Sequence, residues 1–129
     1  MHKNTVILGV IFAILAVVLG AFGAHGLKSI LSTEALATFE VGVRYQMYHA
    51  LALIVVGLSG KLTGKIVYTL TTFFTLGILL FSGSIYLLSL QDIFTVNFSG
   101  IGFITPLGGT CFILGWCYFL WKIITLKSI

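Results

Sequence analysis

Four long runs of apolar residues, separated by short polar segments, dominate the pattern along this chain. The runs cover about residues 5–27, 40–59, 66–90 and 101–121, and each is close to the roughly 20 residues with which a helix crosses a bilayer. A membrane interior offers no partner for backbone groups, so runs of this length predict helices rather than open strands. The pattern therefore predicts an all-α integral membrane protein, a four-helix transmembrane bundle that forms one domain over residues 1–129.

The composition supports a lipid-covered protein. Of the 129 residues, 59% are hydrophobic and 8% are charged, whereas a soluble domain carries about 25% charged residues. The mean hydropathy of +1.17 leaves too little polar surface to cover a globule in water. The first run also exceeds the roughly 7–15 apolar residues of a signal peptide, so we expect it to remain as a helix.

Basic residues near the ends of the runs predict the orientation, because Lys and Arg concentrate on the cytoplasmic side. Five lysines fall on one side of the bundle, namely Lys3, Lys61, Lys65, Lys122 and Lys127. Lys28 and Arg44 fall on the other side. We therefore expect a multi-pass protein of the cell membrane with both termini inside, and with the connections at residues 28–38 and 91–100 outside.

Several function classes lack support in the sequence. The net charge of +4 comes from scattered residues and not from the concentrated basic patch of a nucleic-acid-binding protein, so we expect no nucleic-acid partner. Cys111 and Cys117 are six positions apart, about 120° from facing each other on a helix, and no zinc-type Cys/His spacing occurs. Catalytic motifs such as GxSxG, HExxH or a P-loop are also missing. We expect no metal, no cofactor and no catalytic residues.

The second run is unusual because polar residues interrupt its first half. Only residues 50–58 are purely apolar, and nine residues rise only about 13 Å against a hydrocarbon core of roughly 30 Å. We therefore expect this helix to be the least exposed to lipid. Its Gln46/His49 face is expected to point to the bundle centre, beneath a cap made by His25 and the first loop.

Polar residues at similar depths of the four helices define a candidate ligand-binding pocket in the outer half of the bundle. Its expected members are His25, Glu40, Arg44, Gln46, His49, Ser82, Ser84 and Thr105. Plainer interpretations stand beside this one: Glu40 and Arg44 have the i,i+4 spacing of a helical ion pair, and His49 can be a buried interhelical hydrogen-bonding group. Haem ligation by His25 and His49 is a further alternative that two histidines alone support weakly.

Small residues predict close contacts between helices. Ala16, Gly20 and Ala24 recur four apart in the first run, and Cys111 and Gly115 share that spacing in the last, a pattern that lets helix backbones approach closely in membranes. The pattern allows packing within one bundle and also a homo-oligomer. Pro106 lies in the first turns of the last helix, where it marks either a helix start or a kink.

Four ordered blocks resemble a known family. They are residues 20–27 (GAFGAHGL), 39–53 (FEVGVRYQMYHALAL), 80–88 (LFSGSIYLL) and 104–109 (ITPLGG). Together they resemble the domain-of-unknown-function family 423, small bacterial membrane proteins that are similar to the animal transmembrane protein 256. The resemblance implies a small multi-helix membrane protein without an established activity. It also implies that the recurrent polar positions of the family include Tyr45 and Pro106, besides most of the candidate pocket.

The leading functional hypothesis is a non-enzymatic membrane protein that binds a lipid or small amphiphile in the outer-half pocket, with membrane lipids as its partners. The first alternative is an oligomeric small transporter or channel, in which His49 and the Glu40/Arg44 pair line a pathway. The second is a membrane enzyme that acts on a lipid or a quinone.

Overall fold

The computed structural model describes residues 1–127 and is helical along most of that length. Its elements are α1 (Lys3–His25), α2 (Thr33–Leu58), α3 (Gly64–Gly77), the π-helical turn η1 (Ile78–Ser82), α4 (Gly83–Phe94), the short 3₁₀ turn η2 (Ser99–Ile101) and α5 (Ile104–Thr125). Since α3, η1 and α4 form one continuous span, four helices in the described part are long and apolar enough to cross a membrane. The predicted all-α fold with four spans is confirmed.

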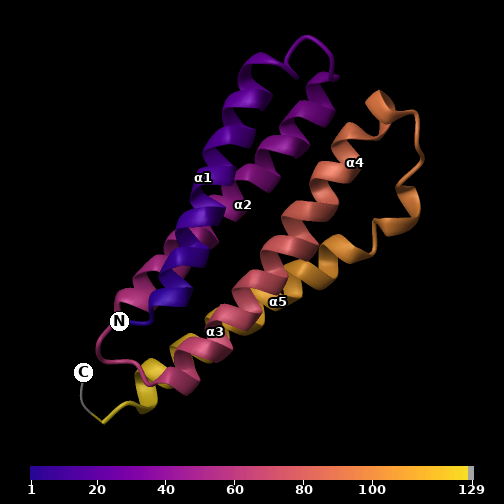
Figure 1. Cartoon of the computed structure of the whole chain (residues 1–129). Helices are drawn as coiled ribbons and strands as arrows, with labels where there is room; N and C mark the ends of the chain where they lie inside the picture. Colours follow the sequence, from indigo (N-terminus) through magenta and orange to yellow (C-terminus); the bar gives the residue numbers. More distant parts are fainter. Residues whose placement is uncertain (128–129) are drawn as a thin grey trace.

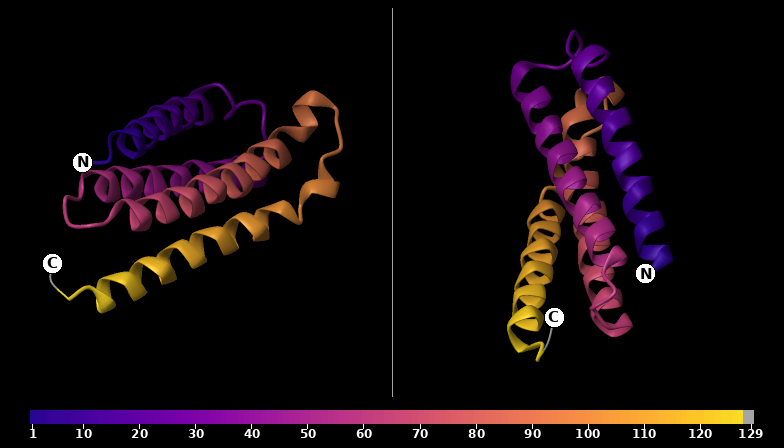
Figure 2. Two further views of the ribbon diagram at one scale, coloured as in Figure 1. Left: turned by 60° about the horizontal axis from the view of Figure 1, so that its bottom comes forward. Right: turned by 90° about the vertical axis from the view of Figure 1, so that its left-hand side faces the viewer.

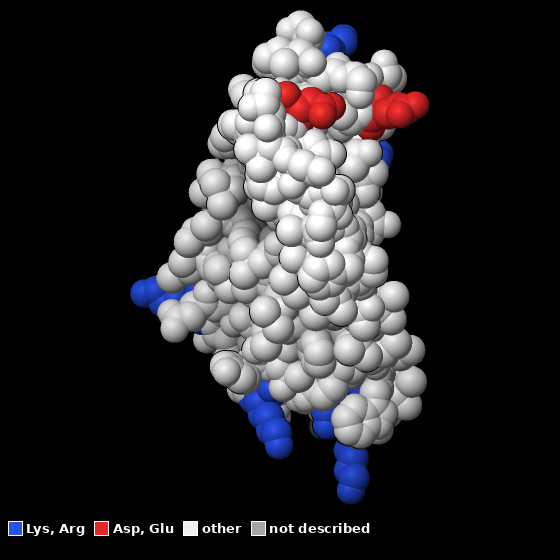
Figure 3. Space-filling model, turned by 90° about the vertical axis from the view of Figure 1, so that its right-hand side faces the viewer, with Lys and Arg blue, Asp and Glu red and all other residues white. Residues whose placement is uncertain are grey.

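The four spans are arranged in three layers. α2 and the α3–α4 span form the middle layer, with α1 on one side and α5 on the other (Figure 2). The N-terminus and the end of α5 lie at the same end of the bundle (Figure 1). Figure 3 shows Asp and Glu side chains near the opposite end and Lys and Arg side chains mainly toward the end with the termini, with a broad uncharged surface between them. Which end faces the cytoplasm stays a prediction.

The helix boundaries differ from the predicted ones, most of all in α2. This helix begins at Thr33 and not near residue 40, because the Ser32 side chain accepts a hydrogen bond from the Ala35 amide at 3.1 Å. A serine in that position supplies the N-terminal cap that a helix start needs. The third span runs on to Phe94 and α5 to Thr125, past the predicted ends at residues 90 and 121, because the backbone hydrogen bonds of a helix can continue beyond its apolar run.

Tight contacts at glycines hold α5 against α3 and η1. A Cβ added at Gly108 would lie 2.2 Å from the backbone nitrogen of Phe81, and one at Gly77 would lie 2.2 Å from the Phe112 ring. Gly115 likewise receives the Phe74 ring, which confirms Gly115 as a packing position, while Cys111 is half-buried. These helices approach so closely because no side chain separates them at these points.

The contact between α1 and α2 also uses small residues, but only some of the predicted ones. Ala16 is buried, and a Cβ at Gly20 would lie 3.3 Å from Val43. Ala24 instead is exposed. A tighter approach occurs at Gly9, where a Cβ would lie 2.8 Å from the Ala50 carbonyl oxygen.

Burial is shared between the two middle spans. In the most apolar stretch of each span, 39% of the residues are buried in both α2 and α3–α4, against 22% in α1 and 17% in the span that ends with α5. The prediction that α2 is the least exposed helix is therefore correct only jointly with the α3–α4 span, which contacts α2 on one side and α5 on the other. Pro106 lies in the first turn of α5, which supports the helix-start alternative over a kink.

Candidate functional site

Gln46 is the central polar residue of α2, and its amide joins three helices. Only 3% of it is exposed. Its Nε2 donates to the carbonyl oxygen of Phe12 in α1 at 2.9 Å, and its Oε1 accepts from the Tyr86 hydroxyl of α4 at 2.6 Å. A buried polar group needs such partners, and Gln46 finds them in the helices on both sides of α2. The side-chain amide of Gln46 carries two N–H groups, and the carbonyl oxygen of Phe12 accepts a hydrogen bond from one of them.

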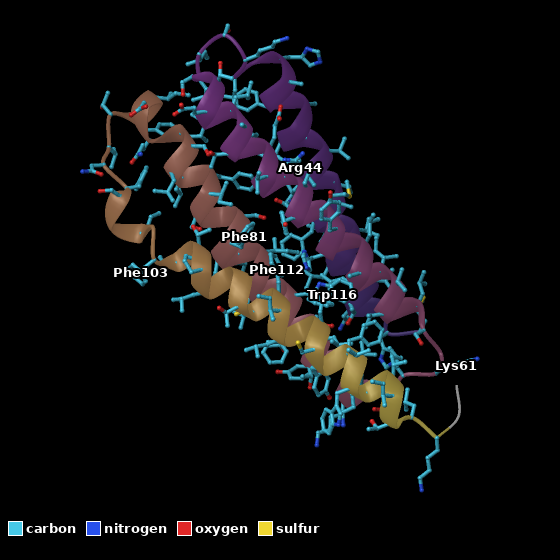
Figure 4. The ribbon with its side chains drawn as sticks, turned by 180° about the vertical axis from the view of Figure 1, so that it is seen from behind. Arg44, Lys61, Phe81, Phe103, Phe112 and Trp116 are labelled. Atoms are coloured by element: carbon cyan, nitrogen blue, oxygen red, sulfur yellow. The ribbon has the colours of Figure 1, made fainter. Side chains whose placement is uncertain are left out.

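His49 lies one turn further along α2, and both its ring nitrogens have protein partners. Nδ1 lies 2.7 Å from the Tyr45 carbonyl oxygen, and Nε2 lies 2.9 Å from Nε1 of Trp116. Because the indole can only donate, Nε2 accepts and Nδ1 carries the proton. The ring also stacks on Phe112, with centroids 3.6 Å apart. The residue is 4% exposed, and it links α2 to α5, whose Phe112 and Trp116 lie in adjacent turns (Figure 4).

Two buried serine hydroxyls form hydrogen bonds from the region around η1 to α2 and α5. Ser82 Oγ donates to the Gly42 carbonyl oxygen of α2 at 2.7 Å. Ser84 Oγ and Thr105 Oγ1 of α5 lie 2.5 Å apart, and Ser84 also donates to the Phe81 carbonyl oxygen at 3.0 Å. Beside the wider π-helical turn, Ser82 reaches α2 and Ser84, two positions on, reaches α5. Such turns are frequent at functional sites of proteins.

The remaining three residues of the expected pocket lie elsewhere. His25, Glu40 and Arg44 are exposed, and Arg44 lies on the outer face of α2 (Figure 4). The structure forms no ion pair between Glu40 and Arg44. The expectation that all eight residues converge on one pocket, beneath a cap formed by His25, therefore does not match the geometry. An α-helix turns by 100° per residue, so Arg44 and Gln46 point to opposite sides of α2.

An apolar groove runs between α1 and the η1–α4 part of the third span, with Gln46 at its base. Its volume is about 270 Å³, and its lining consists of Phe12, Leu15, Val18, Leu19, Gln46, Ile78, Leu79, Gly83 and Tyr86. A Cβ added at Gly83 would meet nothing within 4 Å, which shows that this part of the groove is open. The only polar side chains along it are the hydrogen-bonded Gln46 and Tyr86.

Tyr86 and Trp116 are not among the residues that the sequence pattern predicted for the pocket. Trp116 lies twelve positions into α5, about 18 Å from its start, far from the membrane surface where tryptophan usually lies. A Tyr or Trp in apolar surroundings usually finds a hydrogen-bond partner for its polar atom. A tryptophan or tyrosine in the middle of a span was therefore a usable signal for a partner on another helix.

The buried polar side chains are thus bonded mainly to the protein itself. Within residues 1–127 no group of three or more His, Cys, Asp or Glu side chains is placed to hold a metal ion. His49 has neither ring nitrogen free for a ligand in this arrangement. The site defined by the geometry is a membrane-embedded groove with one polar pair at its base, in a small multi-pass membrane protein.

Comparison with known proteins agrees with that class. Residues 19–109 match the model of the family described as "Protein of unknown function (DUF423)", and the chain belongs to this family. It is 50% identical over 116 residues to the UPF0382 membrane protein YwdK of Bacillus subtilis, covering 88% of this chain and 90% of that protein. It is 43% identical over 100 residues to a UPF0382 membrane protein of Haemophilus influenzae, covering 78% and 77% of the two chains. No solved structure matches.

Proposed function

We propose that this chain is a non-enzymatic, multi-pass protein of the cell membrane that binds a lipid or another amphiphile in the groove between α1 and α4. The observation that carries the proposal is the groove itself, with apolar walls and the Gln46–Tyr86 pair at its base. Ligand sites are commonly apolar concavities with a few placed polar groups.

The depth of the groove favours an amphiphile over a water-soluble ligand. Gln46 is the fourteenth of the 26 residues of α2, so the base of the groove lies about 20 Å from either end of that helix. A solute from water would have to cross apolar surface to reach it, whereas a lipid tail enters sideways from the bilayer. A carbonyl or hydroxyl oxygen on the occupant would accept the second N–H of Gln46.

The arrangement of polar groups favours binding over transport or catalysis. A transport pathway needs polar groups that an ion or substrate can contact in succession. Here Ser82, Ser84 and His49 are bonded to other parts of the protein, and they tie helices together. The groove therefore remains the best supported place for a ligand.

Filling the groove tests this function. Gly83→Leu adds a side chain where a Cβ has open space, so we expect the fold to survive and the groove to be blocked. Cys117→Leu is the matched control, because Cys117 is an exposed small residue of α5 outside the groove lining. Native mass spectrometry after gentle purification should show a lipid or amphiphile retained by the wild type and by Cys117→Leu, and lost from Gly83→Leu. Equal retention by all three proteins would overturn the proposal.

A further inference from the structure

A second feature lies on the opposite side of α2 from the groove. Exposed residues recur there every three or four positions along most of the helix, which places them in one stripe. They are Ala37, Glu40, Arg44, Tyr48, Leu51, Val55 and Leu58. The half of this stripe toward Leu58 is apolar, as expected for a surface in lipid. The half toward Thr33 contains an acid, Glu40, and a base, Arg44.

Arg44 is too deep in the span to be explained as a helix-end residue. Eleven positions separate it from Thr33, the first residue of α2, which is about 17 Å along an axis of about 39 Å. A hydrocarbon core of roughly 30 Å that is centred on this helix, or that ends level with Leu58, places the Arg44 backbone about 8–12 Å inside it. Charged residues at such depth normally face protein or a water-filled cavity and pair with one another. The exposed face of Arg44 therefore lacks a covering partner within the single chain.

We infer that this stripe is the interface with a second copy of the chain, in which Arg44 of each copy pairs with Glu40 of the other. The two charges are opposite, lie one turn apart on the same face and form no ion pair within one chain. Two copies inserted in the same orientation are related by a two-fold axis along the membrane normal, which brings the same residues together at the same depth. Each arginine then has to bridge a height of about 6 Å to reach the partner's carboxylate, which its long side chain allows.

The rest of the stripe suits a contact between two identical helices. On the C-terminal side of the charged pairs, Leu51, Val55 and Leu58 follow the three-and-four spacing along which helices pack. Each of them is at least 50% exposed in the single chain. On their N-terminal side, the small side chain of Ala37 leaves room for the partner helix to approach. The partner that fits this acid–base pattern is therefore a second copy of α2.

Complementary charge variants test the pairing in a form that distinguishes it from contacts with lipid headgroups. Glu40→Lys leaves the stripe with two positive charges, and Arg44→Glu leaves it with two negative charges. Each variant carries a donor or an acceptor fluorophore and is placed in vesicles of phosphatidylcholine, which has no net charge. We expect energy transfer for the wild type, a several-fold loss for either variant alone, and recovery when the two variants are mixed.

Two results of this experiment would contradict the proposal. Wild-type transfer at the level of random collisions would overturn the interface, as expected if Arg44 merely reaches headgroups. A mixture that fails to recover, while circular dichroism shows both variants to be helical, would overturn the Arg44–Glu40 pairing.

Disulfide cross-linking of single-cysteine variants provides a second test, which leaves Glu40 and Arg44 in place. In a background with Cys111→Ala and Cys117→Ala, single cysteines at Leu51, Val55 or Ala52 are oxidised in the same vesicles, with Ile113→Cys as an exposed position on α5. We expect disulfide-linked dimers at 51 and 55 and several-fold fewer at 52 and 113. Equal yields at all four positions would contradict the interface.

Discussion

The indole nitrogen of Trp116 donates a 2.9 Å hydrogen bond to Nε2 of His49, and this bond joins α5 to α2 inside the bundle. The other nitrogen of His49 lies 2.7 Å from the Tyr45 carbonyl oxygen. A buried histidine with free nitrogens would be a candidate for proton or metal chemistry. With both nitrogens bonded and its ring stacked on Phe112, His49 serves as a link between helices.

The first prediction concerns this link. Trp116→Phe removes the indole donor and keeps an aromatic side chain, so we expect a loss of about 0.6 kcal/mol, the average for an interhelical hydrogen bond in a membrane. His49→Gln should also fold with little loss. Steric trapping or denaturant titration of the two single variants and the double variant gives the coupling between them. A coupling near zero would show that the bond contributes nothing to stability.

The number and type of spans were predictable because a bilayer requires long apolar helices. The burial of Gln46 and His49 was predictable for a similar reason, since residues 50–58 are too short to cross alone. The start of α2 was not, because the expected loop at residues 28–38 contains Ser32 and a following segment that favours a helix. Hydrophobicity alone does not detect such a cap.

The partners of the polar residues could not be read from depth alone. Residues at one depth can point to opposite sides of a helix, as Arg44 and Gln46 do, so Gln46 lines the groove while Arg44 lies on the opposite face of α2. Nor does hydrophobicity predict the π-helical turn at Ile78–Ser82, beside which Ser82 bonds to α2 and Ser84 bonds to α5. Tyr86 lies within the apolar run 66–90, where hydrophobicity alone does not distinguish it from its neighbours.

The second prediction tests the contact between α5 and η1. Gly108→Ala would press its methyl group against the Phe81 backbone, since a Cβ there lies 2.2 Å from the Phe81 nitrogen. Backbone cannot move aside as a flexible side chain can, so we expect a loss of about 1–3 kcal/mol. Gly109→Ala is the control, because its Cβ would make an ordinary contact at 3.7 Å. Thermal unfolding in detergent should separate the two variants, and equal midpoints would contradict the packing.

The third prediction concerns the polar pair at the base of the groove. Tyr86→Phe removes the hydroxyl that donates to Gln46 at 2.6 Å, so we expect a loss of about 0.6 kcal/mol. Tyr68→Phe removes the same atom from a tyrosine that is 74% exposed and should leave stability unchanged. Unfolding of both variants under identical conditions measures the difference. A loss of the same size in both would show that the Gln46 bond does not stabilise the bundle.

The fourth prediction concerns orientation in the membrane. Because five lysines lie at one end of the spans and only Lys28 lies at the other, with Arg44 inside α2, we expect the turn between α2 and α3 inside and the turn between α1 and α2 outside. In the background without native cysteines, Ser32→Cys should react with an impermeant thiol reagent added to whole cells, and Thr63→Cys should react only after lysis. Reaction at position 63 in intact cells would reverse the assignment.

The most direct test of the amphiphile-binding groove is light-induced cross-linking in the native membrane. A benzophenone side chain replaces Leu79, which lines the groove, and in a second protein it replaces Ile113, an exposed residue of α5. Mass spectrometry then identifies the molecules attached at each position. The account predicts one or a few amphiphile species at position 79, lost when Gly83→Leu is added, and the bulk lipid mixture at position 113. The bulk mixture at both positions, unchanged by Gly83→Leu, would contradict it.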